Sequence, residues 1–147
     1  MTATRRRARE WAVQMLTAAD LNPPADVRAF MDEYWLQIET LPEDDGGTGG
    51  EKVRGKLKLF AEERVQGVLS CKDELDDIIV PLLENWELYR LGTVERMVMR
   101  MGIWELKSTD VPKGAVINEA VDLVNWFSSP KSRMIVNAVL DKFARKG

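Results

Sequence analysis

The stretch Arg5–Ala19 reads RRRAREWAVQMLTAA and carries apolar residues at the spacing of one helix face. These residues lie three or four positions apart or side by side, at Ala8, Trp11, Ala12, Met15, Leu16 and Ala19. Because an α-helix has about 3.6 residues per turn, this spacing puts them all on one side. The stretch therefore predicts a helix with one buried stripe, which the turn residues after Leu21 end.

The same spacing recurs along the rest of the chain. It predicts further helices over residues 25–40, 51–72, 74–86, 93–107, 112–127 and 130–145. Asp110 before Pro112 and Ser129 before Pro130 are helix-start signals, because a proline in the first turn gives up an N–H that has no partner there. No segment alternates apolar and polar residues as a strand does. The expected fold class is all-α, with about seven helices in one domain of 147 residues.

The composition excludes several kinds of chemistry. The chain has no histidine, and Cys71 is its single cysteine. Triads that use histidine, zinc sites built on cysteine and an internal disulfide are therefore ruled out. No apolar run is long enough to span a membrane, and the basic N-terminus does not lead into a signal-peptide pattern. We expect a cytoplasmic protein, in which any catalysis would have to rest on carboxylates, lysines or hydroxyls.

Two features that could suggest catalysis have simpler interpretations. The acid pairs Asp44/Asp45 and Asp76/Asp77 are interpreted as solvated faces, because neighbouring positions do not give two carboxylates different environments. The run Gly46–Gly50 lacks a preceding strand and a following Lys-Ser or Lys-Thr, so it is not a phosphate loop. We interpret it as a flexible linker.

Positive charge gathers at both ends of a chain whose net charge is −3. Four arginines start the first predicted helix, and these are Arg5, Arg6, Arg7 and Arg9. The helix dipole disfavours a cation at the start of a helix. An anionic partner would explain why four arginines lie there. A second group starts the last predicted helix, where free N–H groups accept phosphate: Lys131, Ser132 and Arg133. Together they predict a shared nucleic-acid surface; a solubilising terminus and ordinary helix capping are the alternatives.

A series of motifs then follows in a fixed order along the chain: Arg5–Glu10 with Ala12–Gln14, Leu83–Trp86, Arg90–Leu91, Val94–Arg96, Arg100, Glu105–Leu106, Asp110–Pro112, Ile117–Ala120 and Val136–Lys142. This ordered set resembles the NusB family of bacterial transcription antitermination factors. The resemblance is dense from about residue 65 to residue 142 and is confined to the first helix before that. Its most specific part is Asp-Val-Pro followed by Ile-Asn-Glu-Ala and Val-Asn-x-Val-Leu-Asp.

The resemblance implies two packed helical subdomains, here residues 1–72 and 73–147, and a role without catalysis. It implies pairing with NusE, a ribosomal protein of the small subunit, and binding of boxA-type single-stranded RNA in nascent ribosomal RNA transcripts, in support of RNA polymerase. The RNA contacts that it implies are the four arginines with Lys131 and Ser132. Glu95 would lie on the NusE side, and Thr17 stands where the family usually has a partner-facing tyrosine. The family's common Lys, Phe and Gly are replaced by Met134, Ile135 and Ala138.

Other interpretations stay open. Glu95 is also a first-turn acid that complements the helix dipole. The chain could be a helical protein adaptor without specific RNA binding. A ribosomal RNA methyltransferase with a NusB-like domain would need a Gly-rich loop after a strand, which this sequence lacks. The sequence leaves open a monomer or a homodimer, which an exposed Trp11 could promote.

Overall fold

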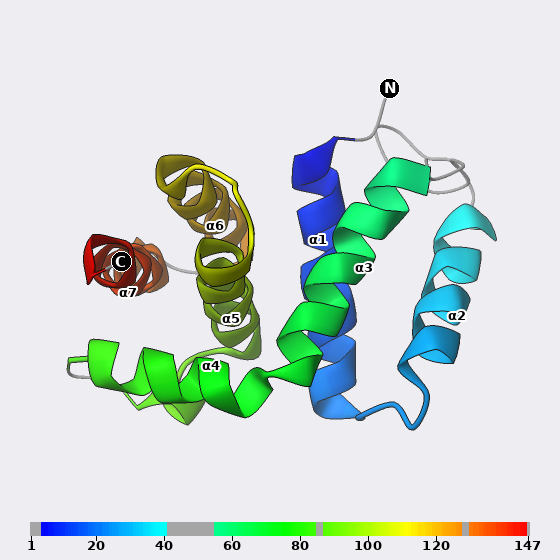
Figure 1. The fold of residues 1–147 in the computed structure, drawn as a ribbon. Coiled ribbons are helices and arrows are strands. Elements are labelled where there is room, and N and C mark those ends of the chain that lie inside the picture. Colours follow the sequence, from blue (N-terminus) through cyan, green and yellow to red (C-terminus); the bar gives the residue numbers. More distant parts are fainter. Residues whose placement is uncertain (1–3, 41–54, 85–86, 128–129, 147) are drawn as a thin grey trace. The chain divides into compact units, whose positions relative to one another are not determined.

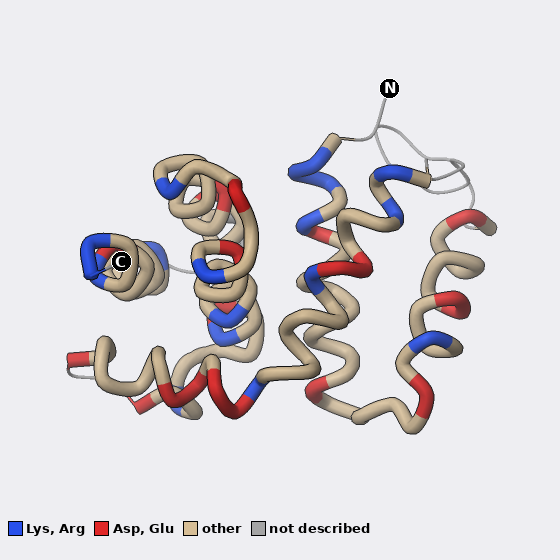
Figure 2. Tube along the Cα trace, in the orientation of Figure 1, with Lys and Arg blue, Asp and Glu red and all other residues tan. Residues whose placement is uncertain are grey.

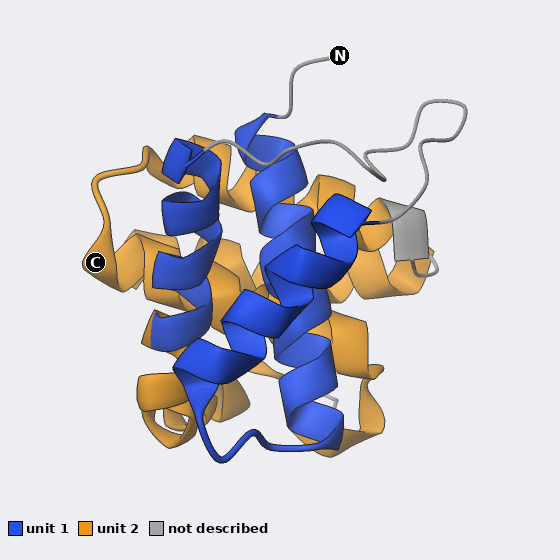
Figure 3. Ribbon diagram, turned by 90° about the vertical axis from the view of Figure 1, so that its right-hand side faces the viewer, with its two compact units in different colours: residues 1–66 blue, residues 67–147 orange. Residues whose placement is uncertain are grey.

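A computed structural model of the chain describes residues 4–40, 55–84, 87–127 and 130–146. These ranges hold no strand, and their helices are α1 (Arg5–Leu21), α2 (Val27–Thr40), α3 (Gly55–Ser70), α4 (Lys72–Ile79), α5 (Thr93–Ser108), α6 (Lys113–Phe127) and α7 (Pro130–Lys146) (Figure 1). The all-α prediction is confirmed. The chain divides into two compact units, Met1–Gln66 and Gly67–Gly147, which Figure 3 colours separately. The glycine-rich run and the pair Asp44/Asp45 lie outside the described residues.

In unit 1, aromatic side chains join α1 to α2. The rings of Trp11 and Trp35 meet edge to face, with their centroids 5.6 Å apart, and both residues are buried. Edge-to-face pairs of this kind are favourable beyond the area that they bury. Asp26 accepts a hydrogen bond from the N–H of Ala29 at 3.0 Å. This cap explains why α2 begins at Val27 and not at the predicted residue 25.

Glu62 on α3 joins that helix to α2. Its carboxylate accepts hydrogen bonds from Trp35 Nε1 at 2.8 Å and from Arg28 Nη1 at 3.2 Å. The hydrogen bond from Arg28 is the main reason that the pKa of Glu62 lies below its ordinary value, against the opposing effect of burial. The carboxylate of Glu62 is therefore charged at neutral pH and accepts hydrogen bonds from both Arg28 and Trp35.

In unit 2, α5 contacts α4, α6 and α7, and all of its residues from Arg96 to Ile103 are buried. Arg100 on α5 is 1% exposed and donates two hydrogen bonds to the carboxylate of Asp76 on α4, at 2.7 and 2.8 Å. Tyr89 donates a third to Asp76 at 3.2 Å. Interpreting the pair Asp76/Asp77 as a solvated face is thus wrong for Asp76, which is buried, and holds for Asp77, which is exposed.

The fourth helix is shorter than the sequence predicted. It ends at Ile79 instead of continuing to residue 86, and a 3-10 turn, η1 (Val80–Leu82), follows. Pro81 is the cause, because it has no N–H to donate to the carbonyl four residues earlier and its ring crowds that carbonyl. Leu83 is then extended, and a second 3-10 turn, η2 (Leu88–Arg90), leads to α5. Residues 85 and 86 lie outside the described part.

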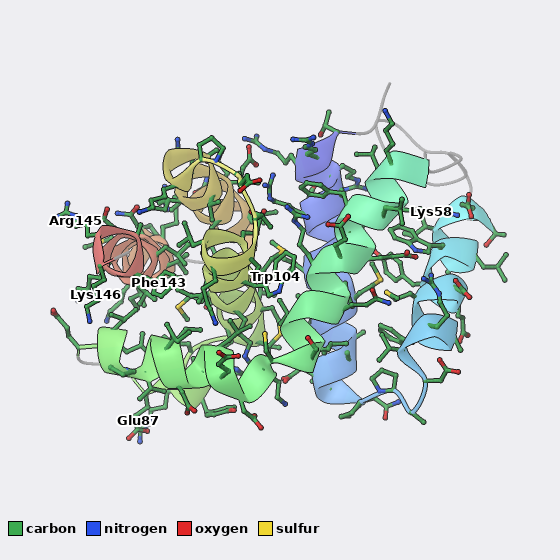
Figure 4. All side chains as sticks on the ribbon, in the orientation of Figure 1. Lys58, Glu87, Trp104, Phe143, Arg145 and Lys146 are labelled. Atoms are coloured by element: carbon green, nitrogen blue, oxygen red, sulfur yellow. The ribbon has the colours of Figure 1, made fainter. Side chains whose placement is uncertain are left out.

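A glycine allows α3 to meet α5 closely within unit 2. A Cβ added to Gly67 would lie 2.2 Å from Cε2 of Trp104 on α5, nearer than real Cβ atoms come to a non-bonded atom. Trp104 is labelled in Figure 4. Only glycine leaves room for the indole ring at this place. The close contact between α3 and Trp104 explains why glycine, which weakens helices, is found near the end of α3.

Candidate nucleic-acid interface

The four predicted arginine contacts occupy the first turns of α1. Thr4 caps this helix, since its Oγ1 accepts a hydrogen bond from the N–H of Arg7 at 3.3 Å. Lys and Arg positions crowd the start of α1 in Figure 2. Arg5 and Arg6 are exposed, whereas Arg9 keeps only 5% of its surface exposed. The helix start therefore presents some of its cations to solvent and uses others inside the fold.

The ring of Phe60 on α3 gathers three guanidinium groups. The Cζ atoms of Arg64, Arg9 and Arg5 lie 3.4, 5.0 and 5.5 Å from its centroid. Arg64 Nη1 also donates to the carbonyl oxygen of Phe60 at 3.2 Å. The placement of Arg5 and Arg9 on one face agrees with their spacing of four residues. Phe60 and Arg64 were not predicted, because no local signal reveals that a ring about 50 residues away will pack on α1.

Arg7 is held differently. Its Nη1 lies 3.3 Å from Glu10 Oε1, and its guanidinium lies 5.8 Å from the ring centroid of Trp11. Trp11 itself is 1% exposed, as its place in the predicted buried stripe requires, so the exposed Trp11 that could promote a dimer is not found. The pairing fixes the direction of the Arg7 side chain before any ligand binds.

The second predicted group lies at the start of α7 in unit 2. Lys131 is exposed, and Ser132 is half-buried and donates a hydrogen bond to Glu95 Oε2 at 3.1 Å. The Nε of Arg133 is buried, and no residue in the described part accepts a hydrogen bond from it. The structure thus brings a predicted RNA contact, Ser132, against a predicted partner contact, Glu95.

Glu95 lies in the first turn of α5, and its carboxylate folds back over Gly92. A Cβ on Gly92 would lie 2.7 Å from both carboxylate oxygens. Thr17, the other predicted partner residue, lies on α1 in unit 1, is half-buried, and its hydroxyl has no hydrogen-bond partner among the described residues. Whether Glu95 and Thr17 form one partner surface, and whether the two basic groups form one strip, stay predictions.

Three of the positions that depart from the family pattern, all on α7, line a groove in unit 2. Met134, Ile135 and Ala138 on α7 face Leu82 and Leu83 across a volume of about 260 Å³. Met134 is 72% exposed. One edge of the groove is fixed by Lys142, whose Nζ lies 2.7 Å from Glu84 Oε1. The three departures therefore change one continuous surface next to Lys131.

The described residues also bear on other kinds of site. Among them, no three His, Cys, Asp or Glu side chains are grouped so that they could hold a metal ion. Nor does any helix of this part have the length and apolar character needed to cross a membrane. The arginine-rich start of α1, on a helical scaffold, is typical of the class of proteins that bind anionic partners.

The comparison with known proteins makes this class specific. The sequence pattern of the NusB family matches residues 6–145. The chain belongs to the NusB family, and so to the transcription antitermination factors and not to the enzymes.

Two relatives extend over nearly the whole chain. The transcription antitermination protein NusB of a Nitratiruptor species is 34% identical over 144 residues, which cover 98% of this chain and 94% of that protein. The protein of the same name from Anaeromyxobacter dehalogenans is 35% identical over 144 residues, covering 98% of this chain and 92% of that protein.

Solved structures share the fold. T. maritima NusB superposes with a TM-score of 0.80 at 27% identity, covering 99% of this chain and 94% of that one. A crystal structure of antitermination factors NusB and NusE in complex with dsRNA gives a TM-score of 0.75 at 25% identity, with 97% of both chains covered.

Proposed function

We propose that this chain, paired with NusE, binds boxA-type single-stranded RNA in nascent ribosomal RNA transcripts and assists RNA polymerase as part of an antitermination complex in the cytoplasm. The observation that carries the proposal is the capped arginine start of α1, in a chain whose family includes a solved NusB–NusE complex with dsRNA. Single-stranded RNA is the proposed ligand, because sequence is read mainly from unstacked bases.

The arginines act in two ways in this proposal. Arg5 and Arg6 are exposed, so their guanidinium groups reach phosphate oxygens, where a planar fork forms paired hydrogen bonds. Arg9 is buried beside Phe60 and supports the helix start more than it contacts RNA. Lys131, exposed at the start of α7 in unit 2, is a further proposed contact with phosphate.

The protein partner contacts a different set of residues. Glu95 in unit 2 and Thr17 in unit 1 are the proposed NusE contacts, and the carboxylate of Glu95 is the charged group among them. Phosphate contacts position the RNA without choosing its sequence, so the preference for boxA comes mainly with NusE present. The two sets of contacts give the chain one role, which is to hold RNA and a protein together.

A binding titration tests the proposal. The RNA is boxA-type or scrambled, with and without NusE, at two salt concentrations. In Arg5→Ala/Arg6→Ala, we expect weaker RNA binding and a salt slope reduced by about 1.4, since each lost phosphate contact removes about 0.7 for a single strand. Arg145→Ala/Lys146→Ala removes the same charge at the far end of α7 and is the matched control.

Two outcomes would contradict the proposal. An unchanged salt slope in the Arg5/Arg6 variant would remove these residues from the RNA contact. NusE binding without any preference for boxA over scrambled RNA would favour the protein adaptor instead.

A further inference from the structure

The hydrogen bond between Ser132 and Glu95 joins the starts of two helices within unit 2. Ser132 Oγ, on α7, donates to Glu95 Oε2, on α5, at 3.1 Å. A serine hydroxyl has one proton to donate. While that proton is directed to Glu95, Ser132 can accept a hydrogen bond but cannot donate one to a phosphate oxygen.

The position of the carboxylate is built into the fold. Gly92 has no side chain where a Cβ would lie 2.7 Å from both oxygens of Glu95, so the carboxylate fits over the backbone at the start of α5. The positive end of the helix dipole favours a carboxylate in this first turn. Glu95 is therefore held beside the start of α7.

A carboxylate in this place opposes a phosphate at Ser132. A phosphate oxygen in contact with Ser132 Oγ would lie about two contact distances from Glu95, or about 6 Å. At that distance, the repulsion of two unit charges lowers affinity about threefold in water, and about tenfold at half its dielectric constant.

We propose that Glu95 restrains RNA binding at the start of α7, and that the protein partner relieves the restraint by presenting a cation or an N–H donor to Glu95. The inference rests on the proposed function, in which Ser132 faces RNA and Glu95 faces the partner. Capture of the carboxylate does two things: it neutralises the repulsive charge, and it releases the Ser132 proton for a phosphate. Because coupling of binding sites is reciprocal, RNA also raises the affinity for the partner by the same factor.

The charge of Glu95 is tested by Glu95→Gln, which keeps an acceptor for Ser132 and removes the charge. Without NusE, this variant should bind boxA-type RNA about three to ten times more tightly than the natural chain at low salt. With NusE at saturation, the two RNA affinities should converge. Glu87→Gln is the matched control, since Glu87 is an exposed carboxylate in the same unit, ion-paired with Arg90. Its RNA affinity should not change.

The hydroxyl is tested by Ser132→Ala. With NusE at saturation, this change should weaken RNA binding, because the released proton of Ser132 is then lost; without NusE, the effect of Glu95→Gln should be smaller in its background. Equal RNA affinities for Glu95→Gln and the natural chain without NusE would overturn the inference, as would an equal gain in Glu87→Gln. If Arg5→Ala/Arg6→Ala still weakens RNA binding in those cases, the proposed function stands and only the restraint by Glu95 is wrong. If the natural chain binds no RNA, both fail.

Discussion

Replacing Asp76 by alanine should destabilise the protein by about 3–5 kcal/mol, the usual cost of breaking a buried ion pair from one side. The magnitude follows from the surroundings of Arg100. Its side chain is 1% exposed, and it donates to Asp76 at 2.7 and 2.8 Å, so the change removes two charge-assisted hydrogen bonds from a buried cation. The acceptor of Tyr89 is lost as well.

Urea and thermal unfolding, followed by helical circular dichroism, measure this effect. The expected loss corresponds to a midpoint temperature lower by about 10 °C. Asp77→Ala is the matched control, because Asp77 is the neighbouring residue on the same helix and is exposed. Adding Arg100→Met to Asp76→Ala should recover part of the loss, since no uncompensated charge is then buried. A cost for Asp76→Ala within about 1 kcal/mol of that for Asp77→Ala would refute the reasoning.

Two further variants test packing and pH dependence. Gly67→Ala should destabilise the fold by about 1–3 kcal/mol, because its Cβ would overlap the indole of Trp104. Gly114→Ala is the control and should be neutral or slightly stabilising, since nothing lies within 4 Å of its new Cβ. Urea unfolding compares the two variants, and equal stabilities would contradict the contact between Gly67 and Trp104. Glu62 stabilises the fold above its unfolded pKa of about 4.5, and this contribution is lost as the pH falls toward its lower folded pKa. In Glu62→Gln, the urea midpoint should therefore vary less between about pH 7 and about pH 4 than in the natural chain, and an identical pH profile would rule out the contribution.

The helices could be predicted from the sequence because the signal for them is local. Apolar spacing placed the start of α1 at Arg5 and that of α5 at Thr93, in agreement with the structure. The missed end of the fourth helix was also a local matter, since Pro81 is in the sequence and its missing N–H stops the helix. The apolar residues on both sides of Pro81 have the spacing of a helix, so the prediction based on that spacing extended the helix to residue 86.

The contacts between helices could not be predicted in the same way. Asp76 and Asp77 are alike in a charge pattern, and only the position of Arg100, 24 residues away, separates a buried acid from an exposed one. The ring of Phe60 beside Arg5 and Arg9 likewise depends on how α1 packs on α3. For the site, the charge pattern indicated the basic residues and the family resemblance indicated Glu95 and Thr17, whereas the hydrogen bond between Ser132 and Glu95 required coordinates.

Aromatic support changes which substitutions the start of α1 tolerates. The guanidinium groups of Arg5 and Arg9 lie by Phe60, and that of Arg7 lies by Trp11. Lysine would preserve the charge there, but its compact ammonium group lacks the planar shape that packs on an aromatic ring and donates paired hydrogen bonds to two oxygens. Exchange of arginine for lysine, usually regarded as conservative, is therefore a loss of shape at these three positions.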